Sequence, residues 1–231
     1  MGKDGENLLL EGQQLREAGL TYDAVAKLNA AMAQFISDED FARYAHALLD
    51  RAICWQHLYQ ETGDGIFVIL FQSDAETMLK IAESKNLDSE LFQAYFANGK
   101  ANMLQKDYAQ AVEFYRQAIG AMPAGHEAQK GDWLAHLGKA EYWAGQKEAG
   151  LKDTLDGIEL IKKHMHELDS YTTNVWLSGG YLRLADTLKS NDKAASDRYL
   201  AEARKIIESD QTQIMRRKNL KRFEQTGEAG V

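Results

Sequence analysis

Residues 92–123 decide the fold, and they read FQAYFANGKANMLQKDYAQAVEFYRQAIGAMP. Small and large side chains recur in this stretch at spacings that suit two helices packed against each other. Gly99 and Ala111 lack bulk, so two antiparallel helices can approach closely where they cross. Tyr95 and Tyr115 fill the space on either side of that crossing. The closing proline cannot continue a helix, so it ends the second one. The stretch therefore predicts a helix–turn–helix unit.

This spacing resembles one tetratricopeptide repeat (TPR), a helix–turn–helix unit of about 34 residues. Counting Phe92 as position 1, the matching residues are Tyr95 at 4, Gly99 at 8, Asp107-Tyr108 at the turn, Ala111 at 20, Tyr115 at 24, Ala118 at 27 and Pro123 at 32. The resemblance implies an all-helical architecture and a role in holding other molecules.

The composition agrees with an all-helical chain, because only one of the 231 residues is a proline. The net charge of −8 argues against a general nucleic-acid binder, since the phosphate contacts of such proteins need a positive surface. Cys54 is the one cysteine, which excludes an intramolecular disulfide framework and a cysteine-rich zinc site. In an apolar run expected to be core, it is interpreted as an inert buried thiol rather than a nucleophile.

Two features of the sequence bear on location. The first residues, Met1–Glu6, are polar and do not resemble a signal peptide. The longest apolar run, Ile66–Phe71, is too short to span a bilayer. We therefore expect a soluble, cytoplasmic protein without a membrane span.

One repeat cannot bury its own apolar face, so a stable array needs at least three copies. Small residues recur at position 8 of the candidate copies, 39 to 47 residues apart: Gly12, Ala52, Gly99, Gly138 and Gly180. These spacings exceed those of the standard repeat, which predicts elongated helices. The copy around Gly138 is weaker, because glycines replace alanines in its helices and each costs about 1 kcal/mol of helix propensity.

These patterns predict an all-α fold: a right-handed α-α superhelix of about five TPR-like helical hairpins with elongated helices and a C-terminal capping helix. We expect a single domain over residues 5–225. The candidate repeats are 5–37, 39–85, 89–123, 127–165 and 169–208, and the candidate capping helix is 211–225.

Motifs for catalysis are absent from the sequence: there is no glycine-rich phosphate loop, nucleophile elbow or zinc-protease helix. Neither a catalytic residue, a cofactor nor a metal is expected. His164 and His166 come nearest to a metal cluster, but two histidines at i and i+2 lie about 200° apart on a helix and cannot share one ion without breaking the helix. They are interpreted as a solvated helix end.

The TPR resemblance also implies a ligand-binding surface on the concave side, lined by the first helix of each hairpin. Carried over position by position, its lining comprises Gln13, Arg16, His46, Gln56, Gln93, Phe96, Lys100, Asp132, Lys139, Tyr142, Asn174 and Tyr181. The carboxylate clamp known in this family needs Lys and Asn where Leu9 and Gln13 stand, so it is not expected. Lys100 and Lys139 are either two cations for an acidic peptide or two ordinary solvated lysines.

Two further segments have alternative interpretations. The apolar run Ile66–Phe71 is either clasped between neighbouring helices or partly exposed for self-association. The basic cluster Arg216-Arg217-Lys218…Lys221-Arg222 either faces the acidic body of the protein or binds RNA or an anionic membrane surface.

We therefore expect a non-catalytic protein–protein interaction scaffold or adaptor that binds a peptide or protein segment in its concave groove. The alternative is a regulatory or nucleic-acid-associated protein acting through its basic C-terminal helix, although nucleic acid is not the expected partner. An enzyme with scattered site residues is a third class, whose sign would be a pocket shared by His46 and His57.

Overall fold

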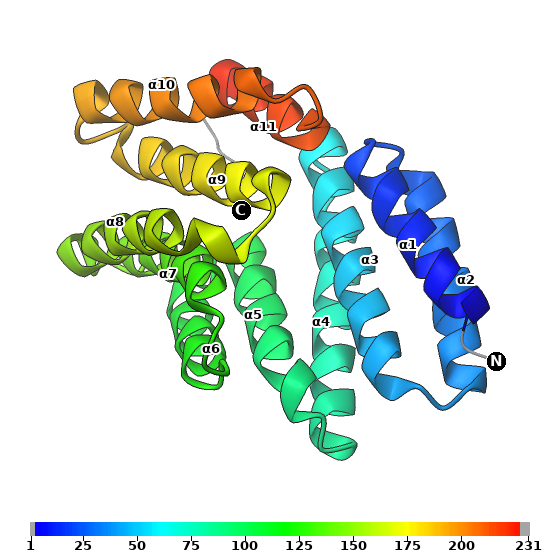
Figure 1. Cartoon of the computed structure of the whole chain (residues 1–231). Helices are drawn as coiled ribbons and strands as arrows, with labels where there is room; N and C mark the ends of the chain where they lie inside the picture. The colour runs from blue at the N-terminus through cyan, green and yellow to red at the C-terminus, as the bar shows by residue number, and fades with distance from the viewer. Residues whose placement is uncertain (1–2, 227–231) are drawn as a thin grey trace. The chain divides into compact units, whose positions relative to one another are not determined.

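The computed structural model describes residues 3–226, and these residues form helices and no strand. The all-α prediction is therefore confirmed for the described chain (Figure 1). The helices are α1 (Lys3–Glu17), α2 (Thr21–Ser37), α3 (Phe41–Thr62), α4 (Ile66–Ser84), α5 (Asp88–Gln105), α6 (Tyr108–Gly120), α7 (Glu127–Trp143), α8 (Lys147–His164), the 3-10 helix η1 (Met165–Glu167), α9 (Ser170–Leu188), α10 (Lys193–Ser209) and α11 (Ile214–Thr226).

The chain divides into two compact units between Lys106 and Asp107. Unit 1 contains α1 to α5, and unit 2 contains α6 to α11. The candidate repeat 89–123 thus contributes α5 to unit 1 and α6 to unit 2. The expectation of a single domain over residues 5–225, with its repeat boundaries, stays a prediction.

Aspartates fix the start of several helices. In each case the side chain of the residue before the helix accepts a hydrogen bond from a backbone N–H in the first turn, which satisfies a group that the helix itself cannot pair. The pairs are Asp40 with Arg43 N–H, Asp107 with Gln110 N–H, Asp169 with Thr172 N–H and Asp192 with Ala195 N–H. The turn that the sequence places at Asp107 therefore has a physical basis in this cap.

Unit 1 is built from consecutive helices that pack against their neighbours in chain order, from α1 to α5 (Figure 1). Leu28, Phe35 and Leu48 are among its fully buried side chains. Gly12 lies where α1 meets α2, and a β-carbon at this position would lie 2.8 Å from Cγ of Leu28. A small residue at position 8 is therefore needed for the close approach, as the sequence pattern predicts.

The second hairpin is long, since α3 has 22 residues and α4 has 19. Elongated helices are thus confirmed here. The apolar run at the start of α4 is partly packed: Phe71 is buried, and Phe67 stacks on Trp55 with ring centroids 6.1 Å apart. Ile66 and Ile69 are 47% and 62% exposed. Self-association through this arm stays a prediction.

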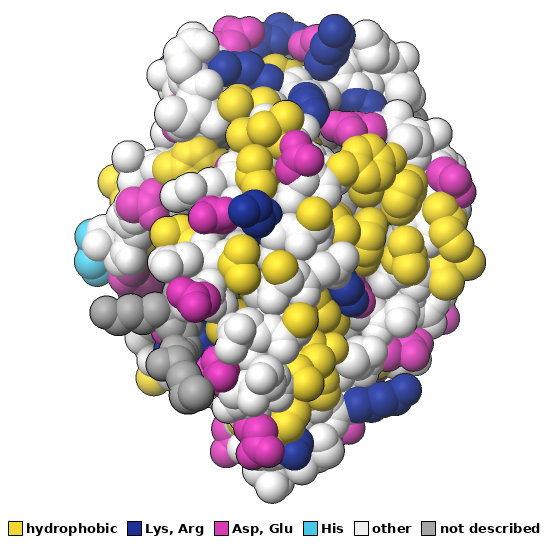
Figure 2. Space-filling model, turned by 90° about the vertical axis from the view of Figure 1, so that its right-hand side faces the viewer, with side chains coloured by type: hydrophobic (Ala, Val, Ile, Leu, Met, Phe, Trp, Pro, Cys, Tyr) yellow, Lys and Arg dark blue, Asp and Glu magenta, His cyan; other side chains and the backbone are white. Residues whose placement is uncertain are grey.

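Exposed apolar side chains also occur on the first hairpin. Leu10, Tyr22 and Ile36 are more than half exposed. Figure 2 views the molecule from the side on which α1 and α2 lie, and there apolar side chains are interspersed with acidic and basic ones. Among the helices within residues 3–226, none has the length and apolar character needed to cross a membrane.

In unit 2, α7 and α8 approach each other so closely that glycines of each helix lie directly against the backbone of the other. A β-carbon on Gly138 would come within 3.0 Å of Gly150 O and of the backbone N of Thr154, and one on Gly150 would overlap Gly138 O in return. Gly131 and Gly157 form a second reciprocal pair of the same kind. The glycines that weaken this copy by helix propensity are therefore what permits its packing.

The rest of unit 2 packs around α9, which contacts α7, α8, α10 and α11. The last helix, α11, buries Met215, Leu220 and Phe223. Leu220 and Phe223 join the apolar cluster of α9 and α10. This apolar inner face and a basic outer face give α11 the amphipathic character expected of a capping helix.

Candidate functional site

First helices of neighbouring hairpins contact one another within each unit. In unit 1, α1 contacts α3 and α3 contacts α5, and in unit 2, α7 contacts α9. These contacts include polar and charged side chains. Several of the groove residues inferred from the TPR resemblance lie at these contacts.

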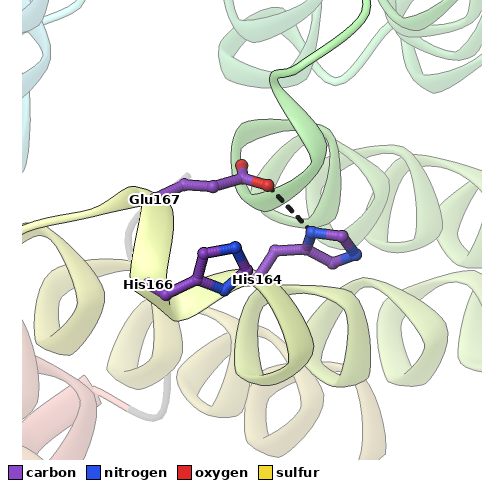
Figure 3. A group of neighbouring side chains, drawn as sticks. All are labelled: His164, His166 and Glu167. Carbon is purple, nitrogen blue, oxygen red and sulfur yellow. Dashed lines mark hydrogen bonds and ion pairs between the residues drawn. The ribbon is translucent and has the colours of Figure 1, made fainter.

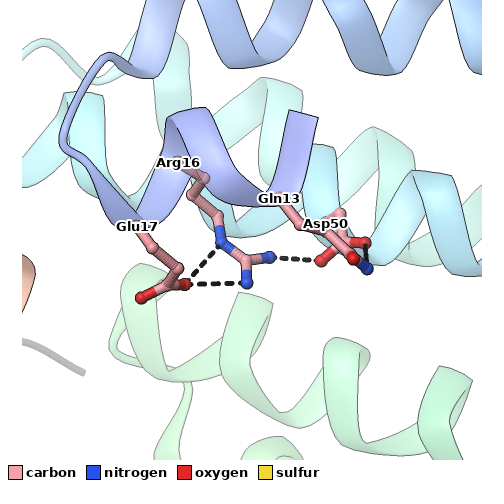
Figure 4. Close-up of polar contacts among 4 residues, drawn as sticks. All are labelled: Gln13, Arg16, Glu17 and Asp50. Atoms are coloured by element: carbon pink, nitrogen blue, oxygen red, sulfur yellow. Dashed lines mark hydrogen bonds and ion pairs between the residues drawn. The ribbon is translucent and has the colours of Figure 1, made fainter. Parts of the chain in front are cut away.

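In unit 1, α1 and α3 are joined through the carboxylate of Asp50 (Figure 4). The side-chain amide of Gln13 donates to Asp50 Oδ2 at 2.8 Å, and Arg16 donates to Oδ1 of the same carboxylate. Arg16 also donates to Glu17 Oε1, from Nε at 3.0 Å and from Nη2 at 2.8 Å. Burial alone would lower the pKa of Arg16, but the negative charges of Asp50 and Glu17 outweigh it and raise that pKa.

In unit 2, a layer of charged groups joins α7 and α9. Arg183 donates to Asp132 Oδ1 at 3.2 Å and lies against Nε2 of His136. One turn further along, Lys139 Nζ lies 2.8 Å from Asp186 Oδ2. All five residues are at most 6% exposed. Charges buried to this extent are tolerated only because each has a partner of opposite sign or a hydrogen bond.

The pairing of Asp186 predicts a pH dependence of stability. Burial alone would raise the pKa of this carboxyl, but Lys139 and then Lys189 lower it overall. A carboxyl whose pKa is lowered by folding stabilises the fold above its unfolded pKa of about 3.9, and this contribution disappears as the pH falls through the folded value. We expect Asp186→Asn to be less stable than the wild type at neutral pH, with the difference shrinking below pH of about 4. Urea unfolding between acid and neutral pH measures this difference. If the difference in stability between wild type and Asp186→Asn stayed constant with pH, the ion pairing of Asp186 would not be its cause.

The twelve groove residues inferred from the resemblance fall into three groups by exposure. His46 is exposed, and Gln13, Arg16, Gln93, Lys100 and Asn174 are half-buried. Gln56, Phe96, Asp132, Lys139, Tyr142 and Tyr181 are buried. The exposed and half-buried members lie in unit 1 except for Asn174. Their contact with a ligand stays a prediction.

The structure brings several of these residues together. Gln13 and Arg16 share Asp50, and the Lys100 ammonium lies 6.0 Å from the ring centroid of Phe96. Other members have partners outside the set: Tyr142 accepts from the Asn191 amide, Tyr181 stacks on Tyr199 at 6.2 Å, and Asn174 donates to Asp210 at 3.4 Å. Lys139 would have to leave Asp186 to serve as a cation for an acidic peptide.

Sequence reasoning missed the partners of these residues, namely Asp50, His136, Arg183 and Asp186. The spacing of charged residues in the sequence could have indicated the pairing in unit 2. Asp132, His136 and Lys139 lie at i, i+4 and i+7, and so on one face of a single helix. Arg183 and Asp186 interrupt an otherwise apolar segment at i and i+3. Two helices with complementary charges at matching spacings are candidates for direct pairing.

The two histidines lie at the end of α8, as the sequence predicts. The α-helix ends at His164, and Met165–Glu167 form a 3-10 turn. The separation of about 200° applies to a continuous α-helix, and the α-helix ends here. Side-chain ligand atoms of His164, His166 and Glu167 all lie within 4.8 Å of one another (Figure 3).

Two arginines of the basic C-terminal helix α11 make contacts within unit 2. Arg217 donates to the backbone carbonyls of Asp210, at 2.6 Å, and Gln211, at 2.9 Å. The guanidinium of Arg216 lies against Gly179 of α9. Lys218 and Lys221 are exposed. No observation here favours RNA or membrane binding, and that alternative stays a prediction.

Cys54 is fully buried in the apolar cluster with Ala24 and Leu28. Burial raises the pKa of its thiol to about 12. The interpretation of Cys54 as an inert core residue agrees with this environment, because the nucleophilic form of a cysteine is the thiolate. The two histidines considered for an enzymatic pocket differ in environment: His46 is exposed, and His57 is half-buried.

Antiparallel helical hairpins with small residues at their crossings define a TPR-like all-α repeat fold. The chain is similar to the crystal structure of a Podosopora anserina putative kinesin light chain with nearly identical TPR-like repeats, at 13% sequence identity and a TM-score of 0.56. The similarity covers 91% of this chain and 100% of that one. The sequence matches no protein-family model, and no curated protein matches it.

Proposed function

We propose that this protein is a non-catalytic interaction scaffold or adaptor, and that it binds a peptide or protein segment on the first helices of unit 1. The TPR-like fold supports a protein-binding role in general. What supports the choice of unit 1 is the exposure of its first-helix residues. His46 is exposed and Gln13, Arg16, Gln93 and Lys100 are half-buried, whereas four of the five groove residues of unit 2 are buried.

The ordering of these side chains also favours a binding surface. Gln13 and Arg16 are held by Asp50 on the neighbouring first helix. A side chain that is already fixed loses little conformational entropy when a partner binds, so more of the interaction energy remains as affinity. The surface is thus pre-organised between α1 and α3.

The chemistry of α5 indicates what kind of segment would fit. Gln93, Phe96 and Lys100 lie at i, i+3 and i+7, and so on one face of the helix. An amide and an ammonium group on this face suit carboxylates and backbone carbonyls of a partner. We therefore propose a segment with acidic side chains, attracted by Lys100.

Selection of random linear peptides on the purified chain, followed by affinity measurement, tests this proposal. We expect enriched peptides to be acidic and to bind Lys100→Glu at least about tenfold more weakly than wild type, because a like charge replaces an attractive one. The matched control is Lys80→Glu, which makes the same charge change on an exposed position of the second helix α4. Equal losses in both variants, or no enrichment, would count against the proposed surface.

A further inference from the structure

We propose that His164, His166 and Glu167 form a zinc-binding site at the C-terminal end of α8. Two imidazole nitrogens and one carboxylate oxygen are a donor set that Zn²⁺ accepts in proteins, with a water molecule in the fourth position. The site lies within unit 2 and is separate from the first-helix surface of unit 1.

The change from α-helix to 3-10 helix brings the three side chains together. His164 is the last residue of α8, and the tighter turn Met165–Glu167 follows directly. His164 Nδ1 lies 2.8 Å from Glu167 Oε1, and the rings of His164 and His166 have centroids 5.8 Å apart. In Figure 3 the carboxylate and both rings gather at one end of the helix.

The distances are close to those that a metal ion requires. Donor atoms bound at about 2.0–2.2 Å to a tetrahedral zinc ion lie roughly 3.4 Å from one another. The three donors here lie within 4.8 Å of one another, and the 2.8 Å between His164 Nδ1 and Glu167 Oε1 is a hydrogen bond that a zinc ion would replace. Because His166 is exposed and His164 half-buried, small side-chain rotations can complete the site.

Two features around the cluster bear on a bound cation. The C-terminal end of α8 carries a partial negative charge near His164, although Lys162 and Lys163 lie in the same turn. Glu167 Oε2 accepts a hydrogen bond from the backbone N–H of Ala128 at 3.1 Å, in the first turn of α7. Contacts of this kind orient a metal-binding carboxylate and strengthen metal binding. A bound ion would therefore fasten the end of α8 to the beginning of α7.

Titration of the tag-free chain with zinc chloride in a calorimeter tests the site. We expect one zinc ion per chain, and we expect His166→Gln to weaken binding at least about tenfold. His46→Gln, which removes an exposed imidazole from α3 in unit 1, is the matched control and should bind zinc like the wild type. Circular dichroism spectra should show that both variants are folded.

A second readout is the melting temperature in the presence of zinc. An ion that binds only the folded chain stabilises it, so zinc should raise the melting temperature of the wild type and of His46→Gln but not of His166→Gln. Wild-type protein that binds no zinc would overturn the proposal. So would equal zinc affinity in wild type and His166→Gln.

Discussion

Gly138→Ala is expected to lower the free energy of unfolding by about 2 kcal/mol or more. A β-carbon at this position would lie 2.6 Å from the backbone N of Thr154 and would also overlap Gly150 O. Backbone atoms cannot rotate away as a flexible side chain can, so α7 and α8 would have to separate. Alanine gains about 1 kcal/mol of helix propensity over glycine, but the overlap outweighs this gain. Thermal and urea unfolding followed by circular dichroism measure the change.

Gly120→Ala is the matched control for this prediction. Gly120 is also helical, at the end of α6, but nothing lies within 4 Å of the position that its β-carbon would occupy. The same substitution should therefore be neutral or stabilising by up to about 1 kcal/mol. Equal effects of the two substitutions would show that the glycine contact between α7 and α8 is not needed.

Asp132→Ala is expected to destabilise the protein by about 3–5 kcal/mol, because it leaves Arg183 buried without its carboxylate. The exposed fractions of the two residues are 6% and 4%, so water cannot replace the lost partner. By contrast, Asp197→Ala removes one half of the exposed pair with Lys193 and should cost no more than about 1 kcal/mol. Chemical unfolding of the two variants provides the comparison.

A double variant separates the pair from the general effect of mutating the core. Asp132→Leu/Arg183→Met replaces both charges by apolar side chains, and such replacements are often neutral or stabilising. We expect it to recover most of the stability that Asp132→Ala loses. A double variant as unstable as Asp132→Ala would indicate that these residues stabilise unit 2 by something other than their mutual charge pairing.

Much of the fold could be predicted because the residue pattern within 92–123 indicates two helices joined by a turn. Ala111 and Tyr115 are fully buried, and Asp107 caps the second helix at the predicted turn. The cap depends only on a residue three positions further along, so spacing alone reveals it, whereas Tyr115 lies against His136 of α7. The glycines of α7 and α8 are different. By helix propensity each of these glycines is less favourable than alanine. The reason for them lies in the backbone of the facing helix, which leaves no room for a β-carbon.

The site residues were harder to predict for a related reason. Repeat positions indicate which face of a first helix a residue occupies, but not how deeply the next helix buries it. Lys100 and Lys139 occupy equivalent positions, yet Lys100 is half-buried and Lys139 is 5% exposed beside Asp186. Likewise, the sequence predicts a helix end at His164 and His166, but it does not show that a 3-10 turn follows and brings Glu167 towards His164.

Photo-crosslinking distinguishes binding on the first helices of unit 1 from binding elsewhere, because it locates the bound segment on the molecule. A photoreactive residue replaces either His46 on the first helix α3 or Lys80 on the second helix α4, both of which are exposed. With an acidic peptide selected on the wild type, we expect a covalent adduct from position 46 and none above background from position 80. An adduct from position 80 alone, or equal adducts from both positions, would contradict binding on the first helices.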